Sequence, residues 1–334
     1  MAKEHIKNNI MMKLNTTFAG LALKNPIIIS SSGLTNTPAK NKSLEEAGAA
    51  AIVLKSLFEE QIMIQTNEMA TYDSPEADDY LQTYIRSNAI SDYVTLIKES
   101  KKLCNIPIIA SINCYSNGEW TSFATYMQEA GADAIELNIM SIETSKEYKY
   151  GELEQTYIDI VNNVKKKVSI PVIVKLASNL TNPIALINQL YANGVDGIVL
   201  FNRFYQPDIN INNLTFTTGE VFSHASDLSN GLRWTAIAST EVPKAQYAIS
   251  GGVHKGASVI KAILAGASSV EVCSSVYKLG EGEISKMIID LSTWMKDKKY
   301  TSIDDFKGKM NAIKAGKSNP FERTQFMKYF SSKE

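Results

Sequence analysis

Short apolar segments rich in β-branched residues recur along the chain, and longer segments of helical character separate them. Near-continuous apolarity is typical of strands buried on both faces, and intervening helices make such strands parallel. Eight segments have this character: Pro26–Ser30, Ala51–Leu54, Ile108–Ile112, Ala134–Leu137, Val172–Val174, Gly197–Leu200, Tyr247–Ile249 and Ser269–Val272. The repetition predicts an α/β fold, a closed (β/α)8 TIM barrel with long βα loops over its C-terminal face.

The turns before four of these strands share one pattern, in which a helix end is followed by glycine, a small residue and the strand. They are EAGAAAIVLK (Glu46–Lys55), EAGADAIELN (Glu129–Asn138), ANGVDGIVLFN (Ala192–Asn202) and LAGASSVEVC (Leu264–Cys273). Left-handed glycine commonly ends a helix in such turns, so the pattern is structural. No linker rich in Pro, Gly or Ser divides the chain, and we expect residues 1–334 to form a single domain.

The 334 residues include 34 basic and 35 acidic side chains, mixed along the chain, for a formal net charge of −1. This balanced and mixed distribution of charge provides no basic patch that would bind nucleic acid or an anionic membrane. Cys104, Cys114 and Cys273 are too far apart for a zinc motif or a disulfide framework. Because the N-terminus lacks a secretory signal and no segment has membrane-spanning length, we expect a cytoplasmic protein. His5, His224 and His254 do not cluster with acidic residues at metal-ligand spacing, so we expect no metal site.

Two segments are longer than ordinary βα loops, Phe58–Asp92 and Asn202–Arg233. Long loops in compact folds are usually lids or binding loops, and an irregular solvated excursion is the alternative. Near the end of the chain, SIDDFKGKM predicts a capping helix that begins at Ser302, with carboxylates in its first turn.

Lysines end two of the predicted strands, Lys55 in AIVLKS and Lys175 in VIVKLAS. Burying an unpaired ammonium is costly, so we expect both side chains at the ligand-binding mouth of the barrel. A lysine there stabilises negative charge or forms a Schiff base with a carbonyl substrate. Simple exposure at the barrel rim is the remaining alternative.

Two glycines, Gly251 and Gly252, follow the seventh predicted strand in AISGGVHKG. The loops after strands seven and eight of such barrels often bind phosphate, and glycine lets backbone amides approach it closely. After the eighth strand, CSSVYK offers the hydroxyls and amides of Ser274 and Ser275, although a helix N-cap would also explain them.

The stretch AIELNIMSIETSK (Ala134–Lys146) runs from a buried strand into a polar loop. Asn138, Ser141 and Glu143 follow the apolar part of this strand, and the carboxyl ends of barrel strands carry the chemistry of such folds. We therefore predict that this segment is a catalytic loop.

With these residues assembled, the chain resembles the dihydroorotate dehydrogenase family of flavin mononucleotide (FMN) barrels, roughly from Leu14 to Met310. The segments that carry the resemblance are NPIIISSSG (Asn25–Gly33), LKS (Leu54–Ser56), ELN (Glu136–Asn138), VKL (Val174–Leu176), FN (Phe201–Asn202), SGG (Ser250–Gly252) and AGASSVEVCSSVYKLG (Ala265–Gly280). The resemblance implies an FMN-binding barrel that oxidises a C–C bond in dihydroorotate or a related dihydropyrimidine-like substrate.

The resemblance also implies a role for each matching residue. Lys55, Asn138 and Lys175 would contact the flavin ring or ribityl chain, Ser31 and Ser32 would lie beside the ring, Gly251, Gly252, Ser274 and Ser275 would bind the phosphate, and Asn138 and Asn202 would hold substrate. Ser141 stands at the position of the catalytic base, where it would remove a proton while hydride passes to the flavin, with Lys55 nearby.

The chain departs from the family pattern directly after Ser141. The family continues with proline and a substrate-binding asparagine, and this chain has Ile142 and Glu143. Glu143 would face the carboxylate of orotate, and like charges about 4 Å apart repel by several kcal/mol where solvent is excluded. The segments RSNAISD (Arg86–Asp92) and Asp227–Ser229 also differ from the family. These departures favour a substrate other than dihydroorotate itself.

Two other functions remain open from the sequence. The altered loop would suit a flavin-binding protein that has lost dehydrogenase activity, and Lys175 would suit a Schiff-base barrel lyase. The chain has no cysteine cluster for an iron–sulfur centre and no dinucleotide motif. The electron acceptor would therefore be a soluble oxidant or a partner protein, and the resemblance favours a homodimer.

Overall fold

A closed parallel barrel forms the centre of the computed structural model, which describes residues 12–58, 75–114, 121–204 and 206–313. The strands follow the order β4, β3, β13, β12, β9, β8, β7 and β6, and a β4–β6 pairing closes the ring. Their bounds are β3 Ile27–Ile29, β4 Ala51–Val53, β6 Ile108–Cys114, β7 Ala134–Ile139, β8 Val172–Ala177, β9 Gly197–Asn202, β12 Tyr247–Ser250 and β13 Ser269–Val272. All eight predicted strands, and the predicted barrel, are confirmed. A short strand, β5 Leu57–Phe58, pairs with β6 beyond the end of β4.

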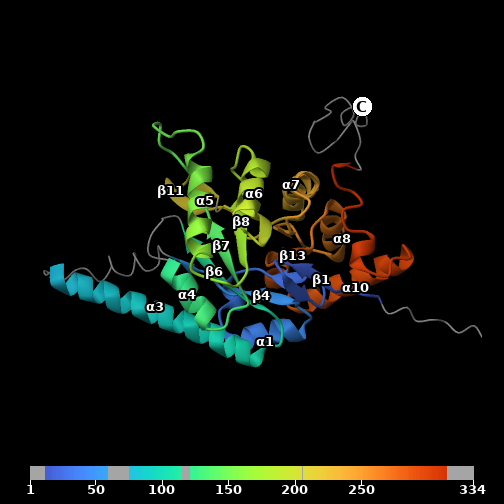
Figure 1. Cartoon of the computed structure of the whole chain (residues 1–334), viewed down its shortest axis with the longest axis horizontal. Helices are drawn as coiled ribbons and strands as arrows, with labels where there is room; N and C mark the ends of the chain where they lie inside the picture. The colour runs from blue at the N-terminus through green and yellow to red at the C-terminus, as the bar shows by residue number, and fades with distance from the viewer. Residues whose placement is uncertain (1–11, 59–74, 115–120, 205, 314–334) are drawn as a thin grey trace, which may run out of the picture.

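Helices surround the barrel (Figure 1). Their bounds are α1 Pro38–Glu46, α3 Pro75–Leu103, α4 Thr121–Glu129, α5 Glu152–Lys165, α6 Pro183–Ala192, α7 Leu228–Glu241, α8 Gly256–Ala265, α9 Ser274–Leu279 and α10 Gly282–Asp297. Two of them begin with proline after a capping side chain, Thr37 for α1 and Asn182 for α6, which is the preferred chemistry of a helix start.

Four glycines in the turns that lead into the strands have positive φ angles, as the repeated sequence pattern predicts. The angles are 117° for Gly48, 95° for Gly131, 84° for Gly194 and 118° for Gly266. Each ends a helix and directs the chain back into the barrel, so the repeated pattern positions strands and contributes no site residue.

The N-terminal end of the barrel is filled by apolar side chains. A hairpin of β1 Thr16–Phe18 and β2 Leu21–Leu23 supplies Phe18, which is fully buried. Phe18 packs in one cluster with inward residues of the strands, among them Ile109, Ile173 and Val199. Further along the same strands, the inward positions are polar and buried: Ser30, Ser111, Glu136, Asn138, Lys175 and Glu271. The barrel is therefore closed at one end and polar at the other.

The predicted loop over Phe58–Asp92 is wrong from Pro75 onward, where the 29-residue helix α3 begins. Residues 59–74 lie outside the described part. Proline and acidic residues in PEADD at 75–79 suit the first turn of a helix, so the polarity that indicated a loop marks a helix start. The predicted capping helix at Ser302 is shorter than expected, because Ser302 caps only the 3-10 helix η3, Ile303–Asp305.

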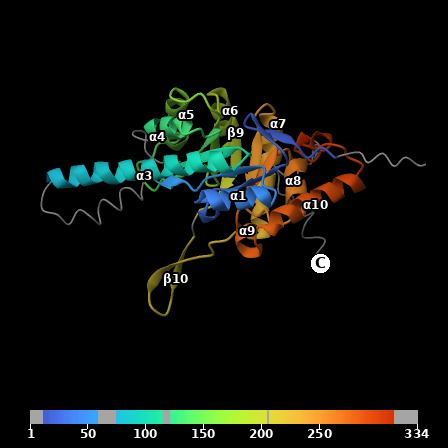
Figure 2. The ribbon, with the colours of Figure 1, turned by 90° about the horizontal axis from the view of Figure 1, so that it is seen from below.

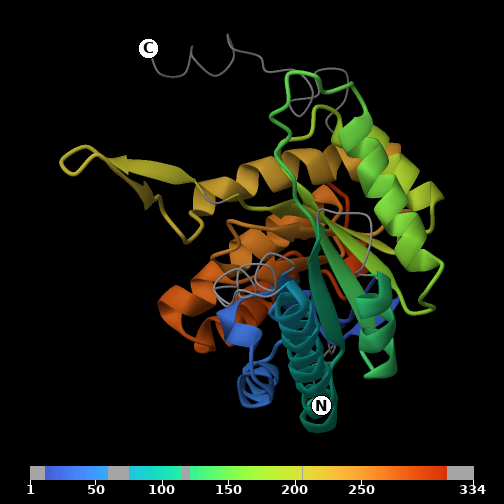
Figure 3. The same ribbon diagram turned by 90° about the vertical axis from the view of Figure 1, so that its left-hand side faces the viewer.

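The second long segment, Asn202–Arg233, is also partly regular. It contains the antiparallel pair β10 Pro207–Asn210 and β11 Thr215–Thr218, then the 3-10 helix η2 Ala225–Asp227 and the start of α7. Another 3-10 helix, η1 Gly33–Thr35, follows β3. The β10–β11 hairpin extends away from the barrel (Figures 2 and 3). Within the described residues, none of the helices has the length and apolarity required to cross a membrane.

Candidate functional site

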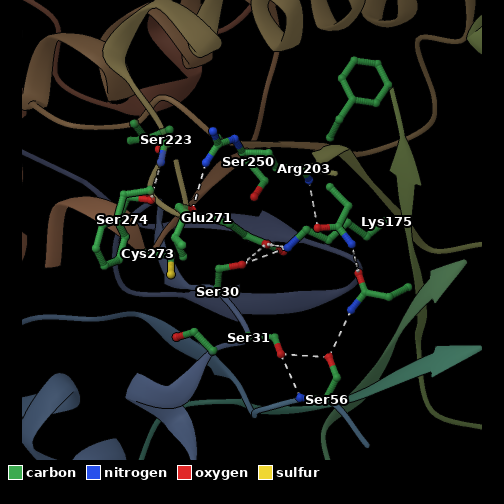
Figure 4. Close-up of a pocket in the computed structure, with 18 of the residues that line it drawn as sticks. Ser30, Ser31, Ser56, Lys175, Arg203, Ser223, Ser250, Glu271, Cys273 and Ser274 are labelled. Atoms are coloured by element: carbon green, nitrogen blue, oxygen red, sulfur yellow. Dashed lines mark hydrogen bonds and ion pairs between the residues drawn. The ribbon is translucent and has the colours of Figure 1, made fainter. Parts of the chain in front are cut away.

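A cavity of about 560 Å³ lies at the carboxyl ends of the barrel strands. Its wall combines polar ends of strands with the loops that follow them (Figure 4). Most of the polar side chains and two of the glycines that line it come from the ends of strands and the loops after them: Ser30, Ser31, Ser32, Ser56, Asn113, Asn138, Lys175, Asn202, Arg203, Ser223, Gly251, Gly252, Glu271, Cys273 and Ser274. Both its size and its position are typical of the ligand site of such barrels.

Lys175 forms the charged floor of the cavity. Its Nζ lies 2.5 Å from Oε2 of Glu271 and 3.6 Å from Oε1 of Glu136. The hydroxyl of Ser30 accepts a hydrogen bond from Lys175 Nζ at 2.9 Å and donates one to Glu271 Oε2 at 2.9 Å. Figure 4 shows Lys175, Glu271 and Ser30 converging from three strands. The ammonium is thus held in place by strands β13, β7 and β3.

This pairing keeps Lys175 charged. Burial alone would lower the pKa of Lys175, but the carboxylates of Glu271 and Glu136 outweigh burial and raise that pKa above its ordinary value. Burial likewise opposes ionisation of Glu271, yet the Lys175 ammonium outweighs it and lowers the pKa of Glu271. A Schiff-base lysine must be a neutral amine when it attacks, so the pairing disfavours the lyase alternative.

A network of hydroxyls and amides forms one side wall. Ser56 Oγ lies 2.9 Å from Ser31 Oγ and 2.8 Å from Ser111 Oγ. The amide of Asn138 donates to both Ser56 and Ser111, at 3.2 and 3.1 Å, and its oxygen accepts from Asn202 at 3.4 Å. Five strands or loops are therefore connected through Asn138, and its side chain has a fixed orientation toward the cavity.

Glycines form the opposite end of the cavity. Gly251 and Gly252 follow β12 directly and have φ angles of 87° and 72°. A Cβ atom added to Gly252 would lie 2.1 Å from the backbone nitrogen of Leu228, whereas one added to Gly251 would meet no atom within 4 Å. The first glycine thus borders open space and the second allows α7 to pack closely. Nearby, Ser274 Oγ accepts a hydrogen bond from the Ser223 amide at 3.0 Å.

Basic side chains gather around the glycine end. Arg203 Nη1 donates to the Val221 carbonyl at 2.9 Å, and Lys278 Nζ donates to the Ser223 carbonyl at 3.4 Å. His254 Nε2 lies 3.0 Å from Ser223 Oγ. Burial, together with the Lys278 ammonium, lowers the pKa of His254. This end of the cavity therefore suits an anionic group.

The structure brings eight of the predicted site residues to the cavity wall: Ser31, Ser32, Asn138, Lys175, Asn202, Gly251, Gly252 and Ser274. Four others do not line it. Lys55 is half-buried, the buried Ser275 donates its hydroxyl to the Val253 carbonyl, Glu143 is exposed, and the Ser141 carbonyl accepts from Asn179. The functional roles of all twelve stay predictions.

Several residues in the cavity wall or directly behind it were not predicted from the sequence: Glu271, Arg203 and Ser223 line the cavity, and Glu136 and Ser111 lie behind it. Glu136 and Glu271 contact Lys175, Ser111 joins the network around Asn138, and Arg203 and Ser223 line the glycine end. A usable signal existed for the two glutamates, because each interrupts an apolar strand at a position of inward alternation. No comparable signal marked Arg203 and Ser223, which follow β9 and the β10–β11 hairpin. In the described residues, no three His, Cys, Asp or Glu side chains are grouped as for a metal ion.

A parallel barrel with a polar cavity at its C-terminal end, a buried cation and a glycine-lined end is a (β/α)8 barrel with a ligand-sized site. Sequence comparison shows to which family of such barrels the chain belongs. Residues 13–295 match the sequence profile of the family described as Dihydroorotate dehydrogenase. The chain therefore belongs to the dihydroorotate dehydrogenase family, and it is an oxidoreductase of the class that acts on CH–CH groups.

Curated relatives match almost the whole chain. One from Thermoplasma volcanium, named dihydroorotate dehydrogenase B (NAD(+)), catalytic subunit, is 30% identical over 311 residues, which cover 89% of this chain and 98% of the relative. One of the same name from Methanocella arvoryzae is 30% identical over 319 residues, 89% of this chain and 97% of the relative. A third, from Methanocaldococcus jannaschii, is 27% identical over 307 residues, 86% and 95%.

Proposed function

We propose that this protein is an FMN-dependent dehydrogenase that oxidises a C–C bond in dihydroorotate or a related dihydropyrimidine-like compound, with residues 1–334 as one FMN-binding domain. The observation that carries the proposal is the cavity itself. It places a buried ammonium at one end and a glycine cradle with basic neighbours at the other, within a volume of about 560 Å³. That arrangement suits a ligand with a polar ring and a terminal phosphate.

The residues present fit the phosphate of FMN. Gly251 borders open space, so its backbone can approach a phosphate without a side chain in between. Ser274 begins α9, and the cationic side chains of Arg203 and Lys278 donate hydrogen bonds to the Val221 and Ser223 carbonyls. Gly251, Gly252 and Ser274 would hold the phosphate. The hydroxyl of Ser275 is engaged with Val253, so its contribution would come from the backbone.

The opposite end fits a flavin ring and a substrate. FMN, when bound, supplies a two-electron acceptor for hydride. Lys175 would stabilise negative charge at the pyrimidine end of the ring, with Lys55 and the backbone of Ser31 and Ser32 alongside. Asn138 is held by Ser56 and Ser111, so its amide would orient either the ring or the substrate.

Ser141 would remove the substrate proton in this proposal. A serine hydroxyl is a weak base, so it requires a relay or exclusion of water by the loop. Glu143 is exposed in the same loop, and its carboxylate accepts a hydrogen bond from the Ser145 amide at 2.7 Å. Asn202 donates a hydrogen bond to the Asn138 side chain and would hold the substrate together with it. Because Glu143 is exposed and does not line the cavity, solvent screens its charge, and it discriminates little between dihydroorotate and a neutral dihydropyrimidine.

Anaerobic bleaching of the flavin tests the reaction. FMN-loaded protein is mixed with dihydroorotate, dihydrouracil and related compounds, and flavin absorbance is followed. Loss of the oxidised-flavin absorbance with one of these compounds supports the proposal and identifies its substrate class. Protein that binds FMN but bleaches only with dithionite would contradict it and favour a flavoprotein without dehydrogenase activity.

The names of the curated relatives support a proposal for the electron acceptor. The names of these relatives include NAD(+) and the words catalytic subunit, which describe those proteins as parts of a larger enzyme. For this chain we propose reoxidation by a soluble oxidant or a partner protein in the cytoplasm. Cys104, Cys114 and Cys273 form no disulfide with one another, which agrees with a reducing compartment. Reoxidation rates with and without NAD+ in a cell extract would separate direct from partner-dependent transfer.

We also propose a homodimer formed through the β10–β11 hairpin. Ile209 pairs across the hairpin with Phe216, and they are 61% and 88% exposed. An isolated two-stranded hairpin is marginally stable and leaves strand edges unpaired. The edge strand β11, TFTT, carries neither charge nor proline, so a second copy of β11 would extend the sheet and cover the apolar side chains.

Sedimentation of the full chain tests this interface. Phe216→Asp should convert a dimer into a monomer, because it places a charge in the covered apolar face. Thr217→Asp, on the opposite face of the same strand, is the matched control and should remain dimeric. A wild-type protein that sediments as a monomer at micromolar concentration would refute the homodimer.

A further inference from the structure

Three charged side chains are buried together beneath the cavity. Glu136, Lys175 and Glu271 come from β7, β8 and β13, and they are 0%, 4% and 2% exposed. Lys175 Nζ is 2.5 Å from Glu271 and 3.6 Å from Glu136. The proposed function uses the lysine and leaves both glutamates without a role.

The charges in this cluster do not balance if both glutamates are ionised. One ammonium would then face two carboxylates, and the surplus negative charge would be buried. Both oxygens of Glu136 and Oε1 of Glu271 have no hydrogen-bond partner. An uncompensated buried carboxylate is very costly, and two adjacent carboxyl groups commonly resolve the conflict by retaining one proton.

A proton on one of the two carboxyl groups would resolve this conflict. Both carboxyl groups lie within 4.0 Å of the same Lys175 nitrogen. Two carboxylates can only accept hydrogen bonds, so neither can satisfy the other while both are ionised. One proton turns a Glu136 oxygen into a donor, for which the unpartnered Glu271 Oε1 is an acceptor. Burial and the charge of Glu271 also raise the pKa of Glu136 well above its ordinary value.

Other titratable groups that face the cluster are neutral. Burial raises the pKa of Tyr93, whose hydroxyl is engaged with Ser111, and it raises the pKa of the Cys273 thiol. Ser30 contributes only a hydroxyl. Among the described residues, Lys175 is the one cation recorded within 4.0 Å of either carboxyl group. The missing positive charge must therefore come from a proton.

We propose that Glu136 and Glu271 share a single proton beneath Lys175, and that this proton sets the charge that the cavity presents to its ligand. With the proton, the three side chains are neutral in total. Without it they carry one negative charge directly below Lys175, which opposes added electron density in the ligand. Glu136 is thus a positioning residue that acts through Lys175. The charge effect on a flavin rests on the proposed function, whereas the shared proton does not.

Infrared spectroscopy of the FMN-free protein tests the shared proton directly. A protonated carboxyl group has a C=O stretch above the amide band, and isotopic labelling of glutamate identifies it. We expect this band in wild type at neutral pH and its loss in Glu136→Gln, where Glu271 pairs with Lys175. It should also vanish in Glu271→Gln, because Glu136 then ionises as the sole partner of Lys175. The control Glu283→Gln, a buried glutamate of α10, should retain it.

Absence of the band in folded wild-type protein would overturn the proposal, and so would its persistence in Glu271→Gln. Thermal unfolding provides a second measure. A proton held in the folded state and released on unfolding makes stability fall as pH rises above the ordinary range of glutamate. Wild type should show this fall and Glu136→Gln should not. Equal pH profiles for the two proteins would contradict a shared proton.

The charge effect is measured as the flavin reduction potential at several pH values. We expect equal potentials for wild type and Glu136→Gln at low pH, and a lower potential for wild type once its shared proton is lost. If the reduction potentials of wild type and Glu136→Gln change in parallel over the whole pH range, the proposed effect of the shared proton on the ligand is overturned. If the chain fails to bind FMN, the proposed function fails, while the infrared result still decides the proton.

Discussion

Alanine substitutions at Gly251 and Gly252 should have different consequences, although the two residues are neighbours directly after β12. Both have positive φ angles, 87° and 72°. A non-glycine residue in the left-handed region costs about 1–2 kcal/mol. Their surroundings differ, because a Cβ on Gly251 meets no atom within 4 Å and one on Gly252 would lie 2.1 Å from the Leu228 nitrogen.

The expected magnitudes follow from this difference. Gly251→Ala should lose only the conformational term, about 1–2 kcal/mol of unfolding free energy. Gly252→Ala adds an overlap with the backbone at the start of α7, and overpacking costs a further 1–3 kcal/mol or so, for a total of about 2–5 kcal/mol. The methyl group of Gly251→Ala would instead enter the space in which we place the phosphate.

Urea unfolding and flavin titration separate the two effects. Gly251→Ala should fold and should bind FMN at least about tenfold more weakly, equivalent to about 1.4 kcal/mol. Its affinity for riboflavin, which lacks the phosphate, should stay near that of wild type. Gly252→Ala should show the larger loss of stability. Unchanged FMN affinity in Gly251→Ala, or equal destabilisation by both substitutions, would refute this account of the cradle.

Two further predictions concern the catalytic loop and the C-terminal cap. Ser141→Ala should slow flavin reduction by substrate about a hundredfold or more, as expected for loss of a general base, with little change in FMN affinity. Ser145→Ala in the same loop is the control, and unchanged reduction kinetics in Ser141→Ala would remove Ser141 from the mechanism. Asp305 accepts hydrogen bonds from the Thr301 and Ser302 amides, which lower its pKa to about 2. Because this pKa is depressed, its stabilisation is present above the ordinary aspartate pKa and is lost as pH falls toward 2. The Tm difference between wild type and Asp305→Ala should therefore shrink over that range, and a constant difference would argue against the cap.

The barrel was predictable because its signals are local. Each strand is a short apolar run, and four of the turns that lead into strands carry a glycine with positive φ, such as Gly48 or Gly266. The error over Phe58–Asp92 has a physical reason as well. The start of α3 is polar and acidic, and the same composition suits a solvated loop or the first turn of a helix. The apolar part of α3 that packs on the barrel, with Tyr93 and Ile97 buried, comes only later in the helix.

The site was predictable where one residue carries the signal. Lys175 is conspicuous because a lysine ends an apolar strand, and the glycine pair is conspicuous by itself. The partners of Lys175 could not be predicted, because its pairing with Glu136 and Glu271 depends on the register of three strands. Side-chain alternation places each glutamate inside the barrel, but only the closed ring shows that they meet at the same ammonium.

The central claim is that this cavity binds FMN, and the flavin content of the purified chain tests it most directly. Protein prepared without added cofactor, or incubated with FMN and desalted, is measured for absorbance of released flavin against protein concentration. The account predicts one FMN per chain and, in Lys175→Met, weaker binding or an altered flavin spectrum. A colourless, folded protein that takes up no FMN on titration would contradict it.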